Sequence, residues 1–87
     1  MKEVTLTLSD MLDSITDSSE LKNEILTRSD GDIVTAFSVV WGLVNSIKKK
    51  SVARTIALSA VAKIPDNIVH VVADLGTAIK YIDKESK

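Results

Sequence analysis

The chain has 87 residues, of which 45% are apolar and 26% charged, with a formal net charge of −1 and no cysteine. This composition excludes intrinsic disorder, a collagen-like repeat, a disulfide framework and a thiolate metal site. A chain of this length predicts a single domain over residues 1–87. Because small secreted domains usually need disulfides, we expect a cytoplasmic protein.

The longest uncharged stretch is too short for a simple membrane span. It covers residues 33–47 and contains two serines, a glycine and an asparagine. A transmembrane helix needs about 20 mainly apolar residues. Residues 1–7 contain an acid and two threonines. A secretion signal would need an unbroken apolar core there, so none is predicted.

The beginning of the chain predicts an extended lead-in followed by a short helix. Residues 1–8 hold an alternating run with β-branched side chains, which favours an extended segment. Thr7 or Ser9 can cap the helix that follows, and Asp10 lies three residues after Thr7, as in a capping box. The first helix is therefore expected over about 9–16.

Two further helices follow with similar start signals. Residues 17–20 are Asp-Ser-Ser-Glu, which predicts a cap and a second helix over about 18–28. Gly31 suits a turn, and Asp32 suits the positive end of a helix dipole. The third helix should then run from Ile33 to about Lys49.

The third predicted helix is apolar around most of its circumference. Its narrow polar stripe consists of Thr35, Ser38, Gly42, Asn45 and Lys49. Such a helix lies at the centre of a fold or forms an interface. Trp41 is expected either in the core or as an interface anchor, a role that Phe37 could also take.

The last two predicted helices complete an all-α bundle of about five helices. Ser51 can cap a fourth helix over Val52–Ile64, whose many small residues favour close helix packing. Pro65 suits the first turn of a fifth helix, which should reach about Asp83, with residues 84–87 as a frayed tail. Its predicted apolar seam is Ile68, Val72, Leu75, Ile79 and Ile82. Short connections between helices favour antiparallel neighbours.

Charge is distributed unevenly along the chain. Residues 1–32 carry eight acids and three bases, whereas residues 33–64 carry five bases and no acid. One interpretation is that the acidic helices lie across the basic segment of the same molecule. The other is that a docking patch stays open for an acidic protein, an anionic membrane or nucleic acid. The residues of this candidate patch are Lys48, Lys49, Lys50 and Arg54.

Motifs for catalysis, metal binding and nucleotide binding are missing from the sequence. His70 and Asp74, four residues apart, could give two metal ligands, but nothing marks a third. We interpret them as part of a solvated stripe on the last helix, made of Asp66, His70, Asp74, Thr77 and Tyr81. A nucleophile elbow and a phosphate-binding glycine loop are both missing. The sequence predicts no enzyme, cofactor or metal.

Two functional hypotheses follow. The first is a non-enzymatic protein that binds another protein, as a regulator or inhibitor or by self-association as a homodimer. It would use Trp41 as an apolar anchor and the lysine run with Arg54 as a charged patch. The alternative is a membrane-active or membrane-peripheral protein that uses the cationic, aliphatic segment 33–64. Binding to nucleic acid is a minor alternative, because the helix after the lysine run offers few groove-reading side chains.

Overall fold

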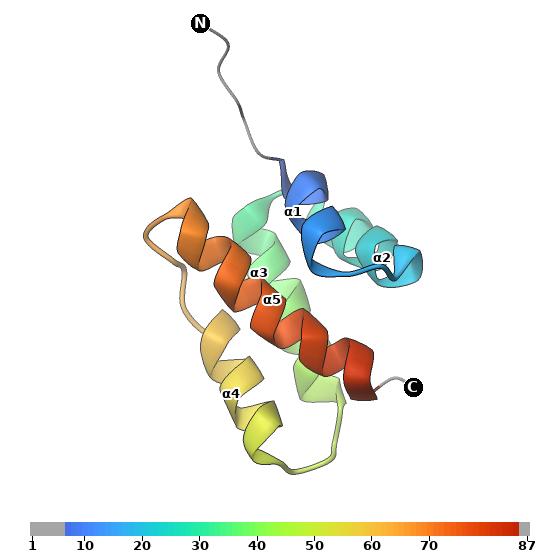
Figure 1. Ribbon diagram of the computed structural model, residues 1–87, viewed down its shortest axis with the longest axis vertical. Helices are drawn as coiled ribbons and strands as arrows, with labels where there is room; N and C mark the ends of the chain where they lie inside the picture. Colours follow the sequence, from blue (N-terminus) through green and yellow to red (C-terminus); the bar gives the residue numbers. More distant parts are fainter. Residues whose placement is uncertain (1–6, 86–87) are drawn as a thin grey trace, which may run out of the picture.

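The computed structural model describes residues 7–85 and shows an all-α bundle (Figure 1). Its helices are α1 (Leu8–Ile15), α2 (Ser19–Ser29), α3 (Ile33–Ser46), α4 (Val52–Val61) and α5 (Ile68–Glu85). The prediction of an all-α bundle of about five helices is confirmed. The last three helices were expected to be longer than the two N-terminal ones, but α4 has 10 residues and α2 has 11. Most of the predicted extended lead-in lies outside the described residues, and Leu8 already belongs to α1.

Side-chain caps define where the helices begin. Thr7 and Asp10 form the predicted capping box of α1, with 3.2 Å between each backbone nitrogen and the other residue's side-chain oxygen. The hydroxyl of Ser18 accepts a hydrogen bond from Leu21 at the start of α2, and that of Ser51 accepts one from Arg54 at the start of α4. These bonds satisfy backbone donors that a helix leaves open in its first turn.

Asp32 caps α3 through two hydrogen bonds from the same residue. Its Oδ2 accepts from the Thr35 hydroxyl at 2.7 Å and from the Thr35 backbone nitrogen at 2.8 Å. The hydroxyl bond, and after it the backbone bond, lower the pKa of Asp32 below its ordinary value. The carboxylate therefore stabilises the fold above the unfolded-state pKa of about 3.9, and this contribution is lost as the pH falls through the lowered folded-state pKa.

Replacing Thr35 with valine should raise the pKa of Asp32 toward its ordinary value, because the hydroxyl donor is lost while the backbone donor remains. The measurement is an NMR titration of the Asp32 carboxyl carbon. A Thr55→Val variant is the control, since Thr55 bonds to Ser51 on another helix. An unchanged Asp32 titration in Thr35→Val would contradict the assignment of the hydroxyl as the main cause.

The fifth helix begins later than its proline suggested. Pro65 lies in the connection between α4 and α5, and α5 starts at Ile68. Asn67 takes the capping role, because its Oδ1 accepts a hydrogen bond from the backbone nitrogen of His70 at 3.1 Å. Asparagine is a strong N-cap residue. Ile64, the residue before Pro65, is pushed by the proline toward an extended conformation, which does not favour a helix start at this point. The prediction that Pro65 occupies the first helical turn is wrong.

Two helices end earlier than expected, and α5 ends slightly later. α3 stops at Ser46 instead of Lys49, and α4 stops at Val61 instead of Ile64. At its far end α5 includes Lys84 and Glu85, which were expected in a frayed tail. As a result, the lysine run belongs to a connection and not to a helix terminus.

α5 is the helix around which the bundle is built. It packs against α1, α3 and α4, and it crosses the middle of the view in Figure 1. Leu75 and Ile79 from its predicted seam are fully buried, whereas Ile68 is exposed beyond the packed part of the helix. α3 packs against α2, α4 and α5 but keeps one side open to solvent. The core residues with no exposed area are Leu12, Ile25, Ala36, Val40, Val44, Ala57, Leu75, Ala78 and Ile79.

Tyr81 is buried, so the predicted solvated stripe of α5 is wrong at this position. Only 5% of Tyr81 is exposed, and its hydroxyl has no hydrogen-bond partner among the described residues. α5 is covered by helices on more than one side, which places Tyr81 inside although a polar stripe was expected there. His70 and Thr77 are exposed, as predicted for a solvated face.

Candidate functional site

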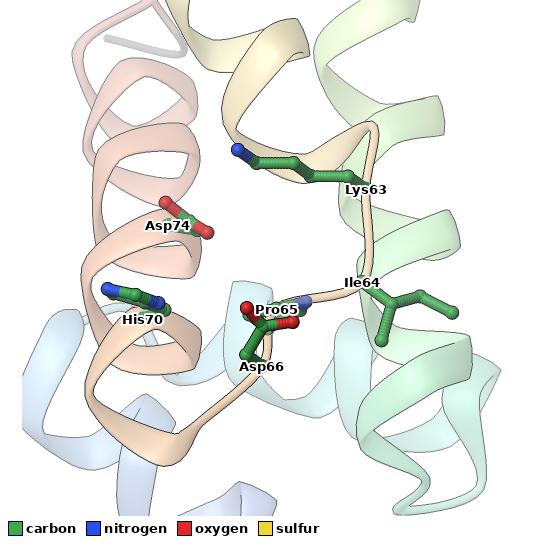
Figure 2. A pocket seen from close by; sticks show the side chains of 6 residues that line it. All are labelled: Lys63, Ile64, Pro65, Asp66, His70 and Asp74. Atoms are coloured by element: carbon green, nitrogen blue, oxygen red, sulfur yellow. The ribbon is translucent and has the colours of Figure 1, made fainter.

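A polar hollow lies where the α4–α5 connection passes α5. Its cavity volume is about 230 Å³, and its lining residues are Lys63, Ile64, Pro65, Asp66, His70 and Asp74. Figure 2 shows His70 and Asp74 on α5, Lys63 and Asp66 across from them, and Ile64 pointing away. Carboxylates, an imidazole and an ammonium group can hydrogen-bond a polar solute here. Within residues 7–85, however, no cluster of three or more acidic or histidine side chains is placed to hold a metal ion.

Trp41 lies on the surface and not in the core. It is 41% exposed, whereas Phe37, one turn earlier on α3, is buried. Trp41 and Ser38 line an open hollow of about 380 Å³ together with Val61 and Ala62 from the end of α4. We call these four residues the Trp41 patch. The structure therefore places an aromatic side chain where a partner can reach it.

The lysine run lies at the opposite end of α4. Lys48, Lys49 and Lys50 are exposed in the connection between α3 and α4, at the lower end of the view in Figure 1. Lys49 forms an ion pair with Glu85, with 3.4 Å between Nζ and Oε1. The Lys49 side chain is 70% exposed, so this pair contributes little to stability.

Arg54 does not share the exposure of the lysines. Its Nε donates to the carbonyl oxygen of Ile47 at 2.8 Å, and its Nη2 donates to the carbonyl and side-chain oxygens of Asn45 at 3.2 and 3.0 Å. These carbonyls belong to the end of α3, where a helix leaves acceptors open. The half-buried guanidinium therefore holds the end of α3 against α4, and Arg54 also lines a surface hollow with Lys50 and Val52.

The acidic helices do not lie over the lysine run. α1 packs against α2 and α5, and α2 packs against α1 and α3. Their ion pairs are local: Lys22 Nζ lies 2.6 Å from Asp13 Oδ1, and Arg28 Nη1 lies 3.3 Å from Glu24 Oε1. Of the two interpretations of the uneven charge, the described residues favour an open basic surface.

The predicted site residues lie at two separate sites on the surface. The Trp41 patch includes the end of α4, whereas Lys50 and Arg54 flank its beginning. A helix of 10 residues is about 15 Å long, so Lys50 and the patch residues Val61 and Ala62 lie at opposite ends of α4, about that far apart. Arg54 instead reaches Asn45, one turn beyond Trp41 on α3.

Sequence reasoning missed the aliphatic residues exposed on α4. Val52 is 77% exposed and Ile56 is 52% exposed, one turn further along the helix. Their spacing of four residues was a usable signal, but the small residues of α4 were taken as packing positions. Only Ala57 among those small residues is fully buried.

Neither a membrane-crossing helix nor a known relative identifies the function. In the part of the chain from 7 to 85, no helix combines the length and the apolar character needed to cross a bilayer. Comparison of the chain with protein-family models, curated proteins and solved structures finds no match.

Proposed function

We propose that this protein is a non-enzymatic binding protein that docks onto another protein through the Trp41 patch, as a regulator or inhibitor or by self-association. The observation that carries the proposal is the position of its single tryptophan, which is 41% exposed over an open hollow. Tryptophan is the side chain most enriched among residues that dominate binding energy at protein interfaces.

The patch has the form of a shallow apolar groove between two helices. Val61 is buried at its base, and Ala62 is small and exposed beside Trp41. Ser38 adds one polar group at the edge. A groove of this kind suits the apolar face of a partner helix, which places a side chain every three or four residues. Val34, one turn before Ser38 on α3, is also exposed and would extend such a contact.

Trp41→Ala tests this proposal, with Val69→Ala as the matched control. Val69 is 70% exposed at the start of α5, outside the patch. Sedimentation at rising concentration measures self-association. Capture from lysate of the native cell, followed by titration of the purified captured protein, measures binding to a different partner. We expect Trp41→Ala to weaken the contact at least ~10-fold and Val69→Ala to leave it unchanged.

Trp41 is also a spectroscopic reporter, because the chain contains no second tryptophan. Its fluorescence should shift to shorter wavelength when a partner covers the hollow. A monomer at all concentrations, together with partners that bind Trp41→Ala as tightly as the unaltered protein, would overturn the proposal. Circular dichroism of each variant confirms that the helices are intact.

A further inference from the structure

The outward side of α4 carries exposed aliphatic residues beside the exposed lysine run. Val52 and Ile56 are four residues apart and therefore share one side of the helix. Ala57 and Val61 are buried and lie on the side that packs against the bundle. Lys48, Lys49 and Lys50 precede α4 and are exposed. We call the set Lys48, Lys49, Lys50, Val52 and Ile56 the α4 face. Lys63, which follows α4, is not part of it, because it lines the polar hollow against α5 together with Asp66 and Asp74 (Figure 2).

The charge of the α4 face has one sign. Residues 33–64 contain no acid. Arg54 is half-buried and bonded to the end of α3, so the exposed lysines supply most of the outward charge. Glu85 is the acid paired with the lysine run, and its contact with Lys49 is a surface pair that an anionic ligand can replace.

The geometry fits a broad anionic surface better than a compact acidic protein site. The lysines lie just before the first turn of α4, and Val52 and Ile56 are exposed beside them along its first two turns. A membrane surface presents anionic head groups to all of these lysines at once and accepts short aliphatic side chains at its acyl boundary. A protein interface usually has an aromatic or arginine anchor at its centre. The α4 face contains neither.

We propose that the α4 face docks on the surface of an anionic lipid bilayer, with the lysines at the phosphate level and Val52 and Ile56 inserted below them. The connection between α3 and α4 lies at one end of the molecule in Figure 1, where it can meet a flat surface. This proposal is independent of the Trp41 patch, because none of the patch residues belongs to the α4 face.

The test is cosedimentation of the full chain with vesicles of phosphatidylcholine and phosphatidylserine in a 7:3 ratio, at low and at high salt. The key variant is Lys48→Glu/Lys50→Glu. The matched control is Lys80→Glu/Lys84→Glu, which changes net charge equally at exposed positions of α5. Lys80 lies beside Ser14 and Ile15 of α1, on another side of the bundle.

We expect binding to anionic vesicles at low salt and none to pure phosphatidylcholine. Lys48→Glu/Lys50→Glu should weaken partitioning at least tenfold, whereas the control pair should weaken it less than threefold. A Val52→Ser/Ile56→Ser variant should weaken it several-fold, and Trp41→Ala should bind as the unaltered protein does. The last comparison separates this proposal from the protein-docking function.

Three results would overturn the proposal. The first is no binding to anionic vesicles at low salt. The second is an equal loss of vesicle binding in Lys48→Glu/Lys50→Glu and in Lys80→Glu/Lys84→Glu. Such a result would show that binding responds to net charge alone. The third is binding to a polyglutamate peptide through Lys48 and Lys50 without binding to vesicles, which would assign the surface to an acidic protein.

Discussion

Replacing Leu75 with alanine is expected to lower the free energy of unfolding by about 3 kcal/mol, the largest effect of any single change discussed. Leu75 has no exposed area, and its helix α5 packs against α1, α3 and α4. A cavity at this point removes contacts that several helices share. The total stability of a domain of this length is only about 4 to 13 kcal/mol.

Chemical denaturation followed by circular dichroism measures the Leu75 effect. Leu75→Met keeps most of the side-chain volume and should cost less than about 1.5 kcal/mol. Val69→Ala removes an exposed side chain from the same helix and should change stability by no more than about 0.5 kcal/mol. Equal stabilities of Leu75→Ala and Val69→Ala would show that α5 is not the centre of the core.

The starts of most helices could be predicted because their causes are local. A cap acts within three residues, so the sequence indicated Thr7 or Ser9, the run 17–20 and Ser51 as start signals. Asp32 was expected only as an acid at the positive end of the helix dipole, and the structure shows that its side chain also caps α3. The fifth start was missed because two local preferences competed. Proline suits a first turn, but the asparagine two residues later is the better cap.

The faces of the helices were harder to predict because they depend on which neighbours cover them. Tyr81 lies inside because α5 has helices on several sides, which its own periodicity does not reveal. Trp41 lies on an apolar helix that leaves one side open, so its composition alone could not distinguish core from surface. The candidate site depends on these same choices, because the exposure of Trp41 decides whether a partner can contact it.

The role of Arg54 could not be read from its position after three lysines. Its partners are the carbonyls at the end of α3, and only the observed end of that helix shows where they lie. Local sequence therefore favoured a patch residue. The three-dimensional arrangement shows a structural role for Arg54, which caps a helix that precedes its own.

Arg54→Met should destabilise the fold by about 2 kcal/mol, because hydrogen bonds from a charged donor contribute more than neutral ones. Methionine retains an apolar stem, so the loss reports mainly on the bonds to Ile47 and Asn45. Arg54→Lys should recover only part of the stability, since an ammonium group cannot reproduce the planar fork of donors. Unfolding by denaturant gives the free energy of unfolding of the unaltered protein, Arg54→Met and Arg54→Lys.

Lys50→Met is the matched control for Arg54→Met, since it removes one positive charge from an exposed position of the preceding connection. It should change stability by at most about 0.5 kcal/mol. If Arg54 served docking and not the fold, Arg54→Met and Lys50→Met would have the same free energy of unfolding, and only binding to the partner would weaken. A larger loss of stability in Arg54→Met separates the structural cation from the lysines, which remain available for an anionic surface.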